Sequence, residues 1–491
     1  MLSHTSVIIS MFIVPLLGAC LFFVPLRDSI LLRIVPFFTG FQVLFSVNLL
    51  LNVMKNDRVF AFGKLFFADM LSAFELLLVS IVFFMASLYM IGYFEPDTQS
   101  SLKTNKMRRF IGLWHLFLFT MTLVFLTNNL GFLWVSIEAT TLASAFLILT
   151  KGHAASIEAM WKYLLVCSVG IAFGLIGTLL LSAASQQALT TGIEPTLLWT
   201  ELKATSALLD KGITLAAFVF VLVGFGTKAG LAPMHTWLPD AHSQAPSPVS
   251  AVFSAVMLNS ALYAIFRFLP LVEGSLGMSG QARALLLFFG LISIGTAMVF
   301  IPSQRDIKRF LAYSSIEHIG VISTGVGLGG IGVTIAMFHT LNHSIAKMLA
   351  FFSAGKLVQS HNTYDMDKIH GAIISNRMWG TGFFLSTLAL IGAAPFAIFM
   401  SELQILKTGF DQGRYVTLAY LLFAIAVIFI AAFKQIMKVT FGTSALEKTI
   451  KSSFSDKLIV FSCLSILIVF GLYMPDWLWN ILDTAANSIG K

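Results

Sequence analysis

Charged residues are scarce in this sequence of 491 residues, since Asp, Glu, Lys and Arg together make up 11% of it. An average soluble domain is about one quarter charged. Apolar residues make up 57%, and the mean hydropathy is +0.87. The chain also lacks any polar linker long enough to separate soluble domains. These deficits exclude an array of soluble domains and predict a single polytopic membrane domain.

Cysteine is also rare: Cys20, Cys167 and Cys463 lie far apart inside apolar runs, and no CxxC spacing occurs. This pattern excludes the usual iron–sulfur and zinc frameworks and gives no sign of a disulfide scaffold. The first residues, MLSH, lack the basic segment that opens a cleaved signal peptide. We therefore expect the first apolar run to be retained as a membrane helix.

Long apolar runs dominate the rest of the chain. A helix needs about 20 apolar residues to cross the hydrocarbon core of a bilayer. On this measure the sequence predicts an all-α, polytopic membrane protein with about fourteen transmembrane helices. The predicted spans are residues 6–25, 30–54, 68–94, 109–126, 129–149, 158–185, 213–239, 247–270, 283–301, 308–328, 331–357, 378–409, 415–439 and 457–476.

Basic residues in the short loops account for the net charge of +8. Lysine and arginine are enriched in the cytoplasmic loops of membrane proteins. The loops with Arg27, Lys106, Arg109 and Arg305 carry more basic residues than the loops on the other side, which holds both termini. We therefore expect an inner-membrane protein with both termini outside the cytoplasm. No RNP, zinc-finger or basic-stripe pattern occurs, so nucleic acid is not an expected partner.

Two of the predicted spans contain glycine and proline at their centres. The seventh reads GFGTKAGLAP at residues 224–233, and the twelfth reads GAAP at residues 392–395. Proline removes a backbone donor and clashes with the preceding turn, so both helices should unwind locally. Interrupted helices in corresponding positions are typical of transporters with inverted repeats; two unrelated kinks are the alternative.

The spacing of the breaks predicts the organisation of the chain. Helices 1–3 occupy residues 1–108, and a first inverted repeat of five helices, helices 4–8, occupies residues 109–270. A second repeat, helices 9–13, occupies residues 271–440, and the last helix with a short tail occupies residues 441–491. Each repeat then contains one broken helix.

Ionisable residues inside the predicted spans are candidates for function, because each costs at least about 2.5–3.5 kcal/mol to insert. Glu138 lies mid-span, and Lys228 lies at the first break, so the two could pair across helices. Burial favours the neutral forms and pairing the charged forms, which suits a lysine that takes and releases a proton. A static ion pair is the structural alternative. Lys162 starts the sixth span, and it either snorkels to the surface or belongs to the relay.

The eleventh span carries a stripe of titratable residues. His339, His343 and Lys347 are spaced i, i+4, i+8 and therefore share one helix face. Histidine titrates near neutral pH, which suits a proton relay. Passive packing of the histidines is one alternative. Metal binding is another, but the stripe ends in lysine, a poor ligand, so no metal is expected. His318 in the tenth span and Glu402 after the second break extend the series across the second half.

Two long motifs resemble a known family. They are KAGLAPMHTWLPDAHSQAPSPVS at residues 228–250 and QRDIKRFLAYSS at residues 304–315. Both are similar to the antiporter-like membrane subunits of respiratory complex I, Mrp cation/proton antiporters and group 4 hydrogenases. The runs WHLFLFTM at 114–121 and IEATTL at 137–142 most resemble the hydrogenase-4 component F branch. The resemblance covers nearly the whole chain.

The resemblance implies roles for the charged residues. Glu138 and Lys228 would form the charged pair of the first half-channel. His339, His343 and Lys347 would lie along the central axis, with Glu402 at the second broken helix. One position departs from the family, because relatives often place a lysine or histidine in the eighth span where this chain has Asn259.

The expected function is therefore proton translocation by a membrane subunit of a redox-driven complex. No nucleotide loop, flavin site or metal cluster is visible, so no cofactor and no redox chemistry are expected in this chain itself. The expected partners are other membrane subunits, peripheral redox subunits and the lipid bilayer. A cation/proton antiporter of the Mrp kind, a coupling subunit for energised inorganic-carbon uptake and a passive scaffold are the alternatives.

Overall fold

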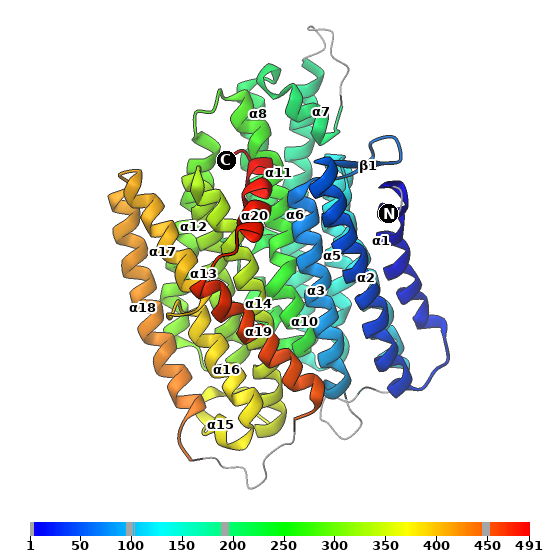
Figure 1. Ribbon diagram of the computed structural model, residues 1–491, viewed down its shortest axis with the longest axis vertical. Helices are drawn as coiled ribbons and strands as arrows, with labels where there is room; N and C mark the ends of the chain where they lie inside the picture. Colours follow the sequence, from blue (N-terminus) through cyan, green and yellow to red (C-terminus); the bar gives the residue numbers. More distant parts are fainter. Residues whose placement is uncertain (1–3, 95–101, 103, 188–195, 444–451) are drawn as a thin grey trace.

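The computed structural model describes the chain except residues 1–3, 95–101, 103, 188–195 and 444–451. Its helices run side by side as a bundle, and a two-stranded antiparallel sheet lies at one end (Figure 1). The elements are α1 His4–Ala19, η1 Cys20–Phe23, α2 Asp28–Asn56, β1 Val59–Ala61, β2 Phe66–Ala68, α3 Met70–Tyr93, α4 Thr104–Leu126, α5 Leu130–Ile148, η2 Leu149–Lys151, α6 Ala154–Gln187, α7 Trp199–Ala204, η4 Ser206–Leu208, α8 Lys211–Ala229, α9 Trp237–Gln244, α10 Ser247–Val252, η5 Phe253–Met257, α11 Leu258–Ser275, α12 Gln281–Phe300, η6 Ile301–Ser303, α13 Ile307–Leu328, α14 Ile331–His361, η7 Met366–Lys368, α15 Ala372–Ser375, α16 Arg377–Leu390, α17 Ala397–Asp411, α18 Tyr415–Thr440, α19 Phe454–Leu472 and α20 Asp476–Ile489.

Helices occupy all fourteen positions that the sequence predicts as spans, which confirms the all-α membrane fold. Within the described residues, eleven helices are long and apolar enough to cross a membrane. The other predicted spans are α13, α14 and the divided pair α16 and α17, which contain the buried ionisable residues of the second half. That these three spans also cross the membrane, which would make a total of fourteen crossings, remains a prediction.

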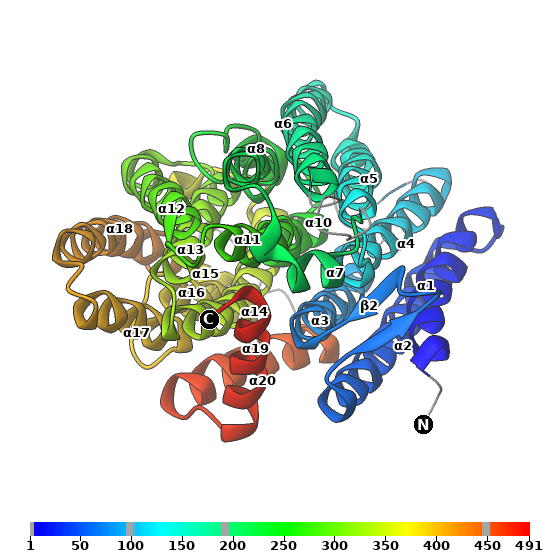
Figure 2. The same ribbon diagram turned by 90° about the horizontal axis from the view of Figure 1, so that it is seen from above.

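The centre of the bundle is formed by the eighth, tenth and eleventh predicted spans. In Figure 2, α10, α11, α13 and α14 lie in the middle, while α1 and α2 lie at one edge and α18 at the other. The continuous span α10–η5–α11 is buried throughout, whereas α18 exposes apolar side chains such as Val416 and Phe423. Lipid-facing positions of a membrane helix are apolar, because hydrocarbon cannot solvate polar groups.

Both predicted breaks are present, and they end their helices in the same way. Gly230 after α8 has φ +80°, and Gly392 after α16 has φ +70°, a backbone conformation that glycine adopts readily. The amide of the next residue then bonds back to a carbonyl five residues earlier, Leu231 to Gly226 and Ala393 to Leu388. This is the hydrogen bond of a Schellman cap.

A proline follows the glycine by three residues at each break, after a cis peptide bond. The chain then resumes as α9 at Trp237 and as α17 at Ala397. The two halves of the chain therefore end a helix inside the bundle with the same backbone motif. This similarity supports the proposed repeats, whose boundaries remain a prediction.

A buried ion pair brings four elements together near the end of the bundle that carries the sheet. Arg267 of α11 donates to both carboxylate oxygens of Asp69, the N-cap of α3, at 2.7 and 2.6 Å, and to the Ser72 hydroxyl at 2.8 Å. Its guanidinium also lies 4.4 Å from the ring centroid of Trp199 in α7 and 5.1 Å from that of Phe67 in β2. A bidentate pair of this kind fixes both partners in orientation.

Candidate functional site

The first group of buried polar side chains surrounds Lys228. This lysine lies in the last turn of α8, directly before the break, and is fully buried. Its ammonium donates to the hydroxyl of Thr141 on α5 at 3.0 Å and to the hydroxyl of Tyr163 on α6. It also lies 4.6 Å from the centroid of the Tyr163 ring. Hydroxyl oxygens and an aromatic face therefore surround the ammonium.

Glu138 is on α5, the helix that also carries Thr141, but it forms no hydrogen bond or ion pair with Lys228. Oε1 of Glu138 accepts a hydrogen bond from Ser168 of α6 at 2.7 Å. Its Oε2 is buried and has no hydrogen-bond partner among the described residues. Thr141 is three residues further along α5 and shares a helix face with Glu138. Each of the two residues thus contacts hydroxyl groups, Glu138 that of Ser168 and Lys228 those of Thr141 and Tyr163, where the sequence suggested a direct ion pair.

Lys162 lies apart from the buried group, although it is next to Tyr163 in the sequence. Its side chain is 49% exposed and forms ion pairs with Glu158 at 2.7 Å and with Asp240 of α9 at 3.2 Å. Asp240 is also bonded to Arg309 of α13. This arrangement fits the snorkelling alternative for Lys162, and its role in a relay remains a prediction.

The second group is built around the histidine stripe of α14. His318 of α13 inserts between the two stripe histidines, with ring centroids 5.1 Å from those of both His339 and His343. A hydrogen bond of 3.0 Å joins Nδ1 of His318 to Nε2 of His339. All three rings are fully buried. The structure therefore brings together three of the residues that the sequence singled out.

The histidine group is hydrogen-bonded to a serine that directly precedes Glu402 on α17. Nδ1 of His339 lies 2.8 Å from the hydroxyl of Ser401 on α17, and Glu402 is the next residue. The Glu402 carboxylate lies against the second break, since a Cβ at Gly392 would come within 2.3 Å of Oε2. It also lines a cavity of about 400 Å³ between α17 and α18. The end of the histidine group is thus a carboxylate beside a broken helix.

Lys347 forms the other end of the stripe. It is fully buried, and its ammonium donates to the backbone carbonyl of Leu311 on α13 at 2.8 Å. His343 lies one turn before Lys347, and neither of its ring nitrogens has a hydrogen-bond partner among the described residues. Nε2 of His318 likewise has no partner among them. Buried polar atoms are ordinarily hydrogen-bonded. These nitrogens are therefore available to exchange protons.

The two groups meet at a π-helical turn in the eighth span. This turn is η5, and its Met257 lies 3.6 Å, sulfur to oxygen, from the hydroxyl of Tyr163. On the other side, Ser254 of η5 is hydrogen-bonded to Ser315 of α13 at 2.7 Å. Single π turns inside α-helices occur frequently at functional sites.

Asn259 and His242 also lie between the two groups. The Asn259 amide donates to the hydroxyl of Ser344, the neighbour of His343 on α14, at 3.1 Å. His242 of α9 is fully buried, and its ring packs against Phe253 of η5 and Phe351 of α14. Both of its ring nitrogens lack a partner among the described residues. His242 is thus a titratable group between Lys228 and the histidine stripe.

Sequence reasoning missed several of these contacts. His242 lies within the motif at residues 228–250, and Tyr163 and Ser401 are next to Lys162 and Glu402, but nothing in their spacing indicates their partners. Thr141 follows Glu138 by three residues, and this spacing was the available signal. The π turn left no pattern in the sequence that separates it from an ordinary apolar helix.

Comparisons with known proteins identify the family to which the chain belongs. Residues 127–430 match the family described as NADH:quinone oxidoreductase/Mrp antiporter, transmembrane. A hydrogenase-4 component F homolog from Methylacidiphilum infernorum is 34% identical over 444 residues, covering 89% of this chain and 90% of that protein.

Two solved structures share the fold. One is a chain of the membrane-bound sulfane sulfur reductase, an archaeal respiratory membrane complex, with a TM-score of 0.84, 23% identity and coverage of 99% of this chain and 96% of that chain. The other is a chain of the Mrp complex from Dietzia sp. DQ12-45-1b, with a TM-score of 0.86, 20% identity and coverage of 99% and 97%. Both belong to membrane complexes of several subunits. This chain is therefore a multi-pass, antiporter-like membrane subunit of the NADH:quinone oxidoreductase/Mrp antiporter family.

Proposed function

We propose that this chain translocates protons as one subunit of a redox-driven membrane complex of the hydrogenase-4 type. The observation that carries the proposal is the buried series of titratable groups from Lys228 to Glu402. The ring of His318 is in contact with those of His339 and His343, and His339 is hydrogen-bonded to Ser401, the residue directly before Glu402. Such residues are retained in a membrane interior mainly where they serve transport.

The path that we propose has two halves. In the first, Glu138 and Lys228 exchange protons through the Thr141 and Tyr163 hydroxyl groups. In the second, protons pass along Lys347 and the three histidines to Glu402 at the second break. The two breaks allow each half to change shape without unfolding a continuous helix. Lys162, at the rim, would supply protons from the surface.

The driving force has to come from partner subunits. Moving one proton against a potential of 100 mV costs about 2.3 kcal/mol. The similarity to a hydrogenase-4 component F homolog supports a complex with peripheral redox subunits. The basic loops support an inner-membrane location with both termini outside the cytoplasm. In Figure 1 the beginning of α1 and the end of α20 lie toward the same end of the bundle, in agreement with an even number of crossings.

In this path, rearrangement of Glu138 and Lys228 would gate proton transfer, and replacement of Lys228 tests this gating role. Lys228→Ala is expected to abolish proton uptake by vesicles that contain the assembled complex, while the amount of assembled complex is unchanged. Lys356→Ala is the matched control, because this lysine is partly buried but bonds the backbone carbonyl of Gly92 at 2.7 Å, outside both groups. Unchanged proton uptake in Lys228→Ala would refute the gating role.

Identification of the partners tests the redox coupling. The chain is extracted in mild detergent, isolated through an affinity tag and analysed by mass spectrometry. Recovery of a nickel–iron hydrogenase-like large subunit with iron–sulfur proteins would support the proposal. Recovery with only other antiporter-like subunits would instead favour an Mrp-like antiporter, and recovery with a soluble zinc protein would favour inorganic-carbon uptake.

A further inference from the structure

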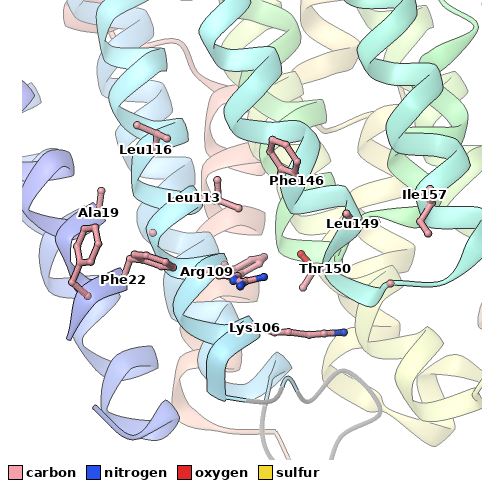
Figure 3. A pocket seen from close by; sticks show the side chains of 14 residues that line it. Ala19, Phe22, Lys106, Arg109, Leu113, Leu116, Phe146, Leu149, Thr150 and Ile157 are labelled. Atoms are coloured by element: carbon pink, nitrogen blue, oxygen red, sulfur yellow. The ribbon is translucent and has the colours of Figure 1, made fainter. Parts of the chain in front are cut away.

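A cavity of about 740 Å³ lies at the outside of the bundle, remote from both groups of titratable residues. Its walls come from η1, α4, the end of α5 and the beginning of α6 (Figure 3). Pockets that bury a drug-sized molecule have volumes of about 300–1,000 Å³. The cavity is therefore large enough to hold a substantial part of a lipid molecule.

One face of α4 lines this cavity along its length. Lys106, Arg109, Leu113 and Leu116 all line it, at spacings of three, four and three residues. They span ten residues, which is about 15 Å along the helix axis. Figure 3 shows Lys106 and Arg109 at one end and Leu116 further along the helix. The lining therefore changes from cationic to apolar in the direction of the helix axis.

The apolar part of the cavity is open to the hydrocarbon side of the bundle. Phe23 of η1 is 78% exposed, and Phe146 of α5 is 51% exposed. A contact between Gly112 and Phe22 closes the floor, since a Cβ at Gly112 would lie 2.9 Å from the Phe22 Cβ. These surfaces suit an alkyl chain, because apolar side chains have no polar group to satisfy there.

The cationic end has the properties of a phosphate site. Lys106 and Arg109 are both exposed, and no ion pair to either is found in the described part of the chain. The ammonium of Lys106 extends toward η2 and α6, where it would lie 3.5 Å from a Cβ at Gly152. Two cations one turn apart on α4, extending in the same direction in Figure 3, can contact the same phosphate, which accepts strong charge-assisted hydrogen bonds.

We propose that this cavity binds one anionic phospholipid, with its phosphate between Lys106 and Arg109 and an acyl chain along Leu113 and Leu116. α4 begins at the end of the bundle that the charge distribution assigns to the cytoplasm. Basic pockets between membrane helices on that side are suited to anionic headgroups. A zwitterionic lipid would bring an ammonium group toward the two cations, so the site prefers phosphatidylglycerol or cardiolipin to phosphatidylcholine. A bound lipid would also join α1 and η1 to the rest of the bundle.

Lipid retention in a defined bilayer tests the proposal. The full chain is placed in nanodiscs of equal parts phosphatidylglycerol and phosphatidylcholine, released in the gas phase, and its bound lipids are counted by native mass spectrometry. Two basic residues acting on one headgroup should favour phosphatidylglycerol by about 30-fold. The double variant Lys106→Gln/Arg109→Gln should lose this preference.

A matched variant controls for the loss of two charges. Arg377→Gln/Lys434→Gln removes two exposed basic residues from the beginning of α16 and the end of α18, the same end of the bundle but far from the cavity. It should retain the wild-type preference. Leu113→Trp keeps both cations and fills the apolar part of the cavity, so it should also lose the retained lipid.

Three results would overturn the proposal. The first is equal retention of phosphatidylglycerol by the wild type and by Lys106→Gln/Arg109→Gln. The second is unchanged retention in Leu113→Trp, which would indicate surface attraction without a seated chain. The third is a polypeptide adduct, in place of a lipid adduct, when a photoreactive residue at Leu116 is activated in native membranes, since a neighbouring subunit would then occupy the cavity.

Discussion

The contact between Lys228 and Tyr163 leads to a prediction about a single hydroxyl group. Tyr163→Phe removes the oxygen that accepts from Lys228 and that bonds Ser144 of α5 at 2.7 Å. The ring remains, so the aromatic face 4.6 Å from the ammonium and the packing against Trp237 should persist. Thr141 still accepts from Lys228 at 3.0 Å. The substitution therefore tests one hydrogen bond and not the volume of the side chain.

The size of the effect follows from the charge of the donor. A hydrogen bond to a charged group contributes about 1.5–3 kcal/mol, which corresponds to a factor of about 10 to 150 in an equilibrium. If the protonated form of Lys228 takes part in transport, its population should fall by a factor in this range. We expect proton uptake to fall by about tenfold or more. Thr141→Val should give an additional loss, because it removes the remaining hydroxyl contact.

The assay is proton uptake by inverted vesicles that contain the assembled complex, followed with a pH-sensitive dye and normalised to the amount of complex. Tyr263→Phe is the matched control, because Tyr263 is equally buried and its hydroxyl bonds Ser72 at 3.0 Å and the Phe125 carbonyl at 3.1 Å. It should leave uptake unchanged. Uptake within about twofold of the wild type in Tyr163→Phe would contradict the proposed path, because the effect would fall below the range for such a bond.

Three further predictions concern the second group and the sheet end of the bundle. Ser401→Ala removes the hydroxyl 2.8 Å from His339 and should lower proton uptake without loss of assembly; uptake equal to that of the wild type would exclude this serine from the path. Arg267→Gln leaves Asp69 buried without its cation and should cost about 3–5 kcal/mol, measured as a lower melting temperature in detergent; an unchanged melting temperature would show that the pair is dispensable. Burial, together with repulsion from Arg267, lowers the pKa of Lys203 in α7 to about 8. Between about pH 8 and 10.5 the unfolded chain therefore binds more protons than the folded chain. Raising the pH through this range should raise the melting temperature of the wild type relative to that of Lys203→Met. Parallel pH profiles of the two melting temperatures would contradict this.

The membrane helices and their breaks could be predicted because both depend on local sequence. An apolar run of sufficient length has to be helical in a bilayer, and glycine with proline has to interrupt it. The stripe His339, His343 and Lys347 could be predicted for the same reason, since it follows from the periodicity of one helix. The helix at each of these positions confirms this part of the prediction.

The contacts between helices could not be predicted, because they join residues far apart in the chain. Lys228 and Tyr163 are separated by 65 positions, and His339 and Ser401 by 62. Nothing in the spacing of Glu138 and Lys228 indicates that hydroxyl groups would stand next to both. Lys162 and Tyr163 are adjacent, yet one side chain lies at the surface and the other in the core, because successive residues on a helix point in different directions.

The π turn η5 has a consequence for how the eighth span can vary. A π turn contains one residue more than the α-helical turn that it replaces. If Phe253–Met257 became a regular α-helix with no residue removed, everything after it would rotate by about 100°. Asn259 would then turn away from Ser344, and Arg267 would turn away from Asp69. The eighth span can therefore lose its π turn only together with one residue.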